Sequence, residues 1–261
     1  MTSPSSQQNG RKRAEIVQEL RRLTSCSSFA ALPPVLPFGL PSLDSCLPQG
    51  GLVLGAVHEI VPATEADSIA VLGFAAALLG RLPRRSPIIF IMRRDSGDAA
   101  GRLSGHGLNS MGLNPARLIV VDTCDDKQAL WAMEEALRSG GPAAIAGLAG
   151  AKLDLLAGQR LHLAAGDSGI PLLLLRPFGL PAANVAATRW RIGAALSARD
   201  RFGLATHWRW HVRLERCRNG RPGKWLVEFD HAAYRFGLPA AMAHPALSRR
   251  AGSQSFVTHA G

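Results

Sequence analysis

The segment Pro62-Ala63-Thr64-Glu65-Ala66-Asp67-Ser68 lies between a predicted strand and a predicted helix, where nucleotide-binding proteins carry a phosphate loop. Such a loop needs glycine N–H groups that close around the phosphates and a lysine that meets the outer ones. This segment contains neither residue type. Pro62 lacks an N–H donor, and Glu65 and Asp67 place negative charge where a phosphate would lie. We therefore expect no cofactor to bind here.

Other residue types that carry chemistry are scattered along the chain. The four cysteines, Cys26, Cys46, Cys124 and Cys217, show no metal-ligand spacing. The eight histidines share no motif either. The sequence therefore predicts no metal site and no catalytic residue.

Positive charge is the strongest compositional signal. The net charge is +11 and the isoelectric point is near 10.8. Between Thr188 and Arg235, eleven Arg or Lys face four acidic residues. This excess favours contact with nucleic acid or with an acidic protein surface. A face of solvated arginines is the alternative.

Within this basic stretch, residues alternate between two strand faces. Trp208 and Trp210 share one face, and Arg209, His211 and Arg213 share the other. We expect the tryptophans to face the core. The arginines either contact DNA phosphates or an acidic partner, or are solvated. The candidates for such contact are Arg189, Arg191, Arg209, Arg213, Arg216, Arg218, Arg221 and Lys224.

The first residues differ in character from the rest of the chain. Met1–Gly10 is polar and is predicted to be disordered. Apolar residues then recur at helical spacing, which predicts a short amphipathic helix that needs a partner surface. They are Ile16, Val17, Leu20 and Leu23. No secretory signal and no membrane-spanning run is predicted, so we expect a cytoplasmic protein without membrane contact.

Strand and helix patterns alternate through the middle of the chain, which predicts an α/β fold with a wound, mostly parallel sheet flanked by helices. Several predicted strands are continuously apolar, so we expect them to be covered on both faces. The predicted strands are Leu52–Val61, Pro87–Met92, Arg117–Asp122, Ala143–Leu148 and Pro171–Pro177. The predicted helices are Ile69–Arg81, Lys127–Ser139 and Leu153–Gly166.

After Pro177 the pattern changes to period-two alternation. Thr188–Gly193, Trp208–Arg216 and Lys224–His231 are predicted to be antiparallel strands added to the sheet near the C-terminus. Asn219-Gly220 fits the turn of a hairpin. We expect a flexible N-terminal segment at 1–35, a core at 36–237 and a flexible tail at 238–261.

Three groups of residues carry a family resemblance. Leu36-Pro37-Phe38-Gly39-Leu40-Pro41-Ser42-Leu43-Asp44 is followed by Gly50-Gly51-Leu52 and then by a strand with Glu59-Ile60. This order resembles the entry to the RecA recombinase core. Together with the degenerate loop and the length, it is similar to the ImuA family of bacterial SOS mutagenesis cassettes. The resemblance covers about residues 36–237 and implies a RecA-like core.

The resemblance also shows which catalytic positions differ. With Glu59-Ile60 as the anchor, Ser68 stands where RecA-type loops have their lysine, Asp67 where they have the preceding glycine, and Pro62 where they have the first glycine. Arg93-Arg94-Asp95 follows the strand after which the catalytic glutamate is expected. The strand that should end in a metal-organising aspartate runs into Ala149-Gly150 instead.

The resemblance implies a non-catalytic adaptor in SOS-induced translesion DNA synthesis and mutagenesis. Its implied partners are ImuB, an error-prone DNA polymerase III α subunit and RecA. Two alternatives stay open at this stage: an SOS-induced cell-division inhibitor, and a DNA-dependent ATPase of the RecA family. Because phosphoryl transfer depends on positioning and charge neutralisation, we expect no enzymatic activity.

Overall fold

The computed structural model describes residues 32–82, 86–94, 103–150, 153–182, 185–199, 201–203 and 205–239. The predicted helix with Ile16, Val17, Leu20 and Leu23 lies outside this part of the chain, as do most residues of both predicted flexible segments.

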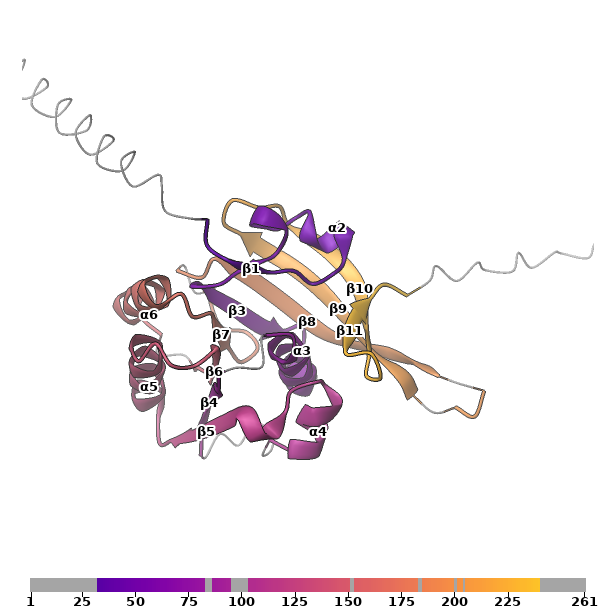
Figure 1. The fold of residues 1–261 in the computed structure, drawn as a ribbon, viewed down its shortest axis with the longest axis horizontal. Coiled ribbons are helices and arrows are strands. Elements are labelled where there is room, and N and C mark those ends of the chain that lie inside the picture. Colours follow the sequence, from indigo (N-terminus) through magenta and orange to yellow (C-terminus); the bar gives the residue numbers. More distant parts are fainter. Residues whose placement is uncertain are drawn as a thin grey trace, which may run out of the picture.

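A nine-stranded sheet organises the described residues, in the order β11-β10-β9-β8-β3-β7-β6-β4-β5 (Figure 1). From β8 to β5 all neighbours pair in parallel, and from β8 to β11 all pair antiparallel. This arrangement confirms the predicted α/β class, the mostly parallel sheet and the added C-terminal strands. The strands are β3 (Val57–Pro62), β4 (Ile88–Arg93), β5 (Leu118–Thr123), β6 (Ala144–Leu148), β7 (Leu172–Leu175), β8 (Thr188–Arg199), β9 (Ala205–Cys217), β10 (Gly223–Asp230) and β11 (Arg235–Gly237).

Helices cover both faces of the parallel strands. The helices α3 (Ser68–Gly80) and α4 (Gly105–Ser110) pack on one face, and α5 (Asp126–Arg138) and α6 (Leu155–Ser168) pack on the other (Figure 1). The core beneath α3 continues under the antiparallel strands, whereas α5 and α6 lie beside the parallel strands only. The second face of β8, β9 and β10 is therefore free of helices in the described part of the chain. We call it the open face.

One carboxylate fixes the conformation of the segment that precedes β3. Asp44, in the short helix α2 (Pro41–Asp44), accepts hydrogen bonds from the backbone N–H groups of Phe38, Gly39 and Leu40 at 2.8 to 3.0 Å. These bonds close the turn and hold Phe38, which is fully buried, against Trp190 with a centroid distance of 5.3 Å.

Apolar character predicted several strands correctly. Every residue of β7 is buried, as a continuous apolar run predicts for a strand covered on both faces, and β3 is buried throughout although it contains His58 and Glu59. The same prediction is wrong for β5, where Ile119 and Val120 are about half exposed. The reason is position: β5 is the edge strand of the sheet.

Two local features depart from the expected elements. The predicted strand Leu52–Val61 is divided, because Gly55 has a φ of +73° and separates β3 from β2 (Leu52–Val53), which pairs with β1 (Val35–Leu36) in a small separate sheet. The helix α4 was not predicted, since its Gly, Asn and Ser residues are weak helix formers. By contrast, the turn at Asn219 is confirmed, with a φ of +60°.

Candidate functional site

The turn between β3 and α3 is closed by its own aspartate. Oδ2 of Asp67 accepts hydrogen bonds from Thr64 N at 2.9 Å and Thr64 Oγ1 at 2.7 Å. Its Oδ1 accepts from the backbone N of Ala194 in β8 at 2.8 Å. Burial raises the pKa of Asp67, but the hydrogen bonds from Ala194 and Thr64 outweigh it, and the net pKa is lowered. An ionised carboxylate therefore accepts from the N–H of Thr64 in this turn and from the N–H of Ala194 in β8.

Little space lies beneath the turn. A cavity of about 40 Å³ separates Ser68 and Pro62 from Arg176, and the leucines Leu148 and Leu175 form part of its wall. The other predicted loop residues stand outside it. Thr64, Glu65 and Ala66 are exposed, whereas Pro62 is buried and Ala63 is half-buried.

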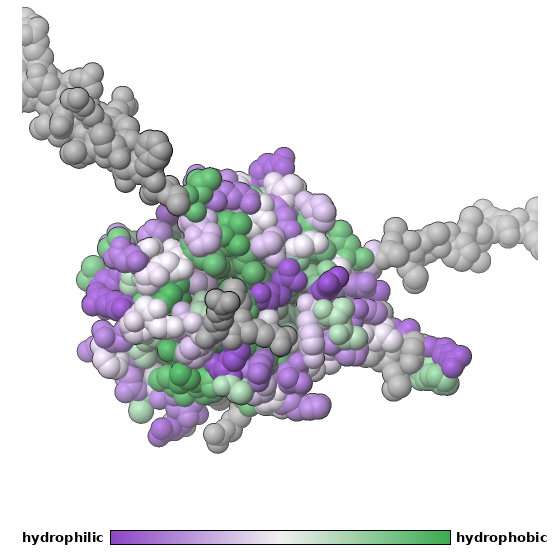
Figure 2. Space-filling model, viewed as in Figure 1, coloured by the Kyte–Doolittle hydropathy of each residue, from purple (hydrophilic) through white to green (hydrophobic). Residues whose placement is uncertain are grey.

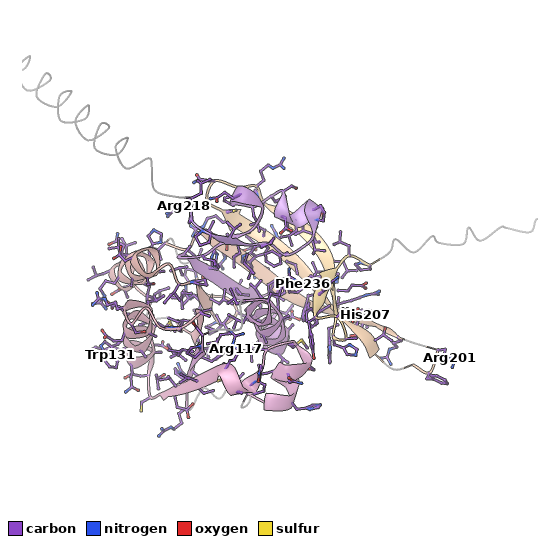
Figure 3. The ribbon with its side chains drawn as sticks, in the orientation of Figure 1. Arg117, Trp131, Arg201, His207, Arg218 and Phe236 are labelled. Atoms are coloured by element: carbon purple, nitrogen blue, oxygen red, sulfur yellow. The ribbon has the colours of Figure 1, made fainter. Side chains whose placement is uncertain are left out.

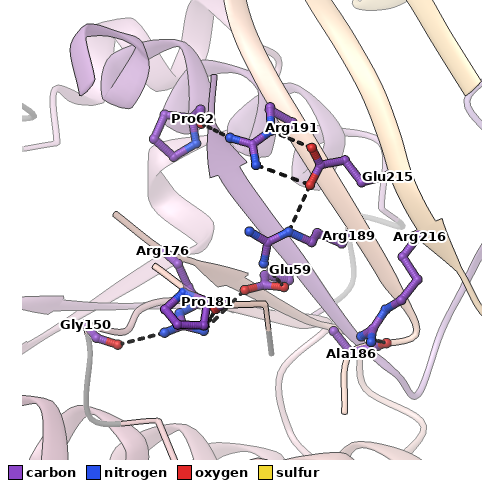
Figure 4. A network of polar contacts seen from close by, with 10 residues as sticks. All are labelled: Glu59, Pro62, Gly150, Arg176, Pro181, Ala186, Arg189, Arg191, Glu215 and Arg216. Carbon is purple, nitrogen blue, oxygen red and sulfur yellow. Dashed lines mark hydrogen bonds and ion pairs between the residues drawn. The ribbon is translucent and has the colours of Figure 1, made fainter. Parts of the chain in front are cut away.

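An ion-pair network lies below this turn, across β3, β8, β9 and the end of β7 (Figure 4). Glu59, fully buried in β3, contacts Nη1 of Arg176 at 3.3 Å and Nη1 of Arg189 at 2.6 Å. Arg189 Nε also donates to Glu215 at 3.0 Å. Glu215 in turn accepts from Arg191 Nε at 2.6 Å. The network thus joins five charged groups from four strands or their ends.

The guanidinium groups of this network are also held by backbone carbonyls. Arg191 Nη1 donates to Pro62 O at 3.2 Å, which ties the open face to the turn. Arg176 donates to Pro181 O at 2.9 Å and to Gly150 O at 3.3 Å. The arginines nearest the turn are therefore engaged within the protein.

Arg93, the last residue of β4, makes a second ion pair within the protein. Arg93 Nη1 lies 3.2 Å from Oδ1 of Asp126, and Gly150 N donates to the same oxygen at 3.3 Å. Asp126 is buried in the first turn of α5. Sequence reasoning did not single out this carboxylate, because nothing local to residue 126 signals that it meets Arg93 at the end of β4 and Gly150 after β6.

The buried His58 of β3 has a strongly lowered pKa. Its Nδ1 lies 2.8 Å from Thr188 Oγ1, and its Nε2 lies 2.8 Å from Val53 O. Because a carbonyl can only accept, Nε2 carries the proton and Nδ1 accepts from the threonine. Trp190 Nε1 donates to the same threonine oxygen at 2.7 Å. Burial lowers the pKa of His58 to about 4, so the side chain is a neutral core residue.

The predicted basic residues divide into engaged and unengaged groups. Arg189 is 8% exposed and, with Arg191, belongs to the buried network. Arg209 pairs with Glu228 at 3.1 Å. Lys224 and Arg213 are exposed on the open face, and no carboxylate pairs with either within the described residues.

The remaining predicted cations lie near the end of the β9–β10 hairpin. Arg216 donates to Ala186 O at 2.8 Å, and Arg221 donates to Ser45 O at 3.4 Å. Arg218 lies 3.5 Å from His162. Figure 3 shows Arg218 far from Arg201, a cation outside the predicted set that lies near the tip of the β8–β9 hairpin. Of these cations, Arg216 and Arg221 are thus held by backbone carbonyls within the protein.

The tryptophans follow the prediction in part. Trp210 is buried in the core, as expected, and so is Trp190 in β8. Trp208 is 45% exposed, so the prediction that it faces the core is wrong. It lines an apolar groove of about 480 Å³ between α3, α4, β8 and β9 and lies beyond the end of the packed core. Ile69, 62% exposed, lies in the same groove.

Comparison with known proteins places this arrangement in a family. Two curated relatives, each named Protein ImuA and drawn from two Caulobacter vibrioides strains, NA1000 / CB15N and ATCC 19089 / CIP 103742 / CB 15, are 38% identical to this chain over 240 residues. The match covers 84% of this chain and 95% of each relative. The chain belongs to the ImuA family. No model of a protein family matches it.

Membership in the ImuA family confirms the resemblance to that family seen in the sequence. In this ImuA family member, none of the helices in the described ranges combines the length and apolar character needed to cross a bilayer.

Proposed function

We propose that this ImuA family member is a non-catalytic adaptor with a RecA-like scaffold, acting in SOS-induced translesion DNA synthesis and mutagenesis. Its proposed partners are ImuB, the error-prone DNA polymerase III α subunit and RecA. Family membership supports the connection with mutagenesis. The single observation that carries the non-catalytic part is the closed turn, in which Asp67 occupies the N–H groups of Thr64 and Ala194.

The chemistry of phosphoryl transfer supports this proposal. Catalysis of that reaction rests on cations and N–H donors that neutralise charge on the transferred phosphate. The residue that stands at the position of the lysine in RecA-type loops is Ser68. Its hydroxyl donates to Glu65 O at 3.1 Å. The guanidinium groups near the turn are paired within the protein: those of Arg176 and Arg189 with Glu59, and that of Arg191 with Glu215.

Exposed apolar surface supports a role in binding proteins. The groove beside Trp208 and Ile69 is lined mainly by apolar side chains. Exposed apolar patches of this kind often mark contact surfaces. In Figure 2, hydrophobic residues are interspersed with hydrophilic ones over the face in view.

Phosphate release from Mg·ATP, with and without single-stranded DNA, tests the non-catalytic part. We expect background release from the wild type and also from Ser68→Lys, because Asp67 would still hold the turn closed. RecA serves as the positive control. Release that single-stranded DNA stimulates in the wild type would overturn the proposal and favour a DNA-dependent ATPase.

Capture experiments test the adaptor part. Immobilised full-length protein is mixed separately with purified ImuB, the polymerase α subunit and RecA, and retention is measured at several salt concentrations. We expect retention of at least one of the three. If none is retained, the adaptor proposal fails whatever the ATPase result.

A further inference from the structure

Two unengaged cations lie directly opposite each other on the open face. In the antiparallel register, Arg213 of β9 pairs with Lys224 of β10 and, on its other side, with Arg191 of β8. Residues directly opposite in such a pair have Cβ atoms about 5 Å apart, and like charges there are destabilising. Within the described residues, Glu215 offsets Arg191, but no carboxylate pairs with Arg213 or Lys224. The row therefore favours an anion from outside the chain.

The surroundings of this row form a hollow of about 420 Å³. Its remaining wall includes Ala63 from the turn, Trp225 and Leu226. Leu226 is 37% exposed and pairs with His211. It follows Lys224 on the same face of β10, with Trp225 between them in the chain. Positive charge and apolar surface are thus adjacent.

We propose that this hollow binds an acidic peptide segment of a partner protein, with a carboxylate between Arg213 and Lys224 and an apolar side chain against Leu226. The inference deepens the adaptor function proposed above and rests on it. Charge-assisted hydrogen bonds from Arg and Lys supply strength and orientation, and the apolar contact adds burial.

The charge distribution favours a peptide over a nucleic-acid strand. A strand binds through a series of phosphates along a continuous basic groove. Here Glu228, opposite Arg209, lies beyond the row of Leu226 and His211, and Glu215 lies on the other side of the cation row. A phosphate backbone that crossed the open face would pass these carboxylates, whereas a single acidic side chain would not.

An array of dodecapeptides tests this proposal with the full-length protein. Each peptide carries two acidic residues and one Leu, Phe or Trp at a varied spacing, and matched peptides carry Gln or Ser in their place. Binding of the best peptide and of a 20-nucleotide oligothymidine is then measured by fluorescence anisotropy. We expect the acidic, apolar peptides to bind, and both replacements to weaken them.

Charge-reversal variants locate the binding. Arg213→Glu and Lys224→Glu should each weaken the peptide by roughly tenfold or more, since each removes a charge-assisted contact. The matched control Lys127→Glu changes an exposed cation on α5 and should leave affinity unchanged. Thermal unfolding of each variant excludes a loss of fold.

Three outcomes would overturn the inference: no array peptide binds, the variants leave peptide binding unchanged, or they weaken oligothymidine binding alone. The last outcome would assign the row to nucleic acid. If partner capture persists while the peptide result fails, the adaptor function stands and only this site is wrong. If partner capture fails while the peptide binds, the peptide site stands and the adaptor function is wrong.

Discussion

Oε2 of Glu59 lies 2.6 Å from Nη1 of Arg189, and both side chains are buried where β3 pairs with β8. The other carboxylate oxygen contacts Arg176. One carboxylate thus offsets two buried guanidinium groups. Removing it leaves positive charge in the interior without compensation.

Glu59→Gln should lower the free energy of unfolding by about 3–5 kcal/mol, the usual cost of breaking a buried ion pair. Urea denaturation measures this change. The matched control is Glu228→Gln, which breaks the half-exposed pair with Arg209 and should cost less than about 1 kcal/mol. Similar losses for both variants would show that the Glu59 network is not a buried determinant of stability.

Acid should destabilise the fold through His58. Its pKa is about 4 in the folded protein and 6.5 in the unfolded chain, so the unfolded chain takes up the proton first as the pH falls. Stability is therefore fully present above pH 6.5, falls between pH 6.5 and about 4, and loses roughly 3 kcal/mol in total.

Urea denaturation at intervals from pH 7.5 to 4.5 measures this slope, with His58→Gln as the comparison. The variant cannot titrate at this position, so its stability should depend less on pH in that window. Equal slopes in the two proteins would contradict a buried neutral histidine.

Asp67→Ala should loosen the turn between β3 and α3. The change removes acceptors for Thr64 and Ala194 and should cost about 1–2 kcal/mol, as for other helix caps. Asp67→Asn should also destabilise the protein, because its amide nitrogen would face an N–H donor at one of the two positions. The exposed Glu65→Ala serves as the control, with an expected change within about 0.5 kcal/mol. Amide hydrogen exchange at Ala194 reports directly on the lost bond.

Arg213→Glu should stabilise the fold while it weakens the proposed peptide site. The new carboxylate would lie opposite Lys224 and Arg191, which replaces repulsion by attraction worth about 0.2–1 kcal/mol per pair. Differential scanning calorimetry should therefore show a higher Tm. Adding Lys224→Glu places two carboxylates opposite each other and should reverse the gain. A lower Tm for the single variant would mean that the cation row is not repulsive.

The distribution of apolar residues along the chain predicted much of the sheet. The runs that became β4 and β7 are apolar throughout, and burial on both faces is the physical reason for such composition. The division before β3 and the exposure of β5 were not predictable in this way. The first depends on a left-handed glycine, and the second on which strand lies at the sheet edge.

The sequence by itself determined that the turn at residues 62–68 contains no lysine or glycine, and that the chain is strongly basic. Only the tertiary structure decided which cations are engaged. Arg176 and Glu59 lie 117 residues apart in the chain, yet they meet because β3 and β7 pair in the sheet. Local patterns describe which face of a strand a side chain occupies, whereas its ion-pair partner depends on strands that are distant in the chain. For that reason Arg189, Arg191 and Arg213 look alike in the sequence and differ in the fold.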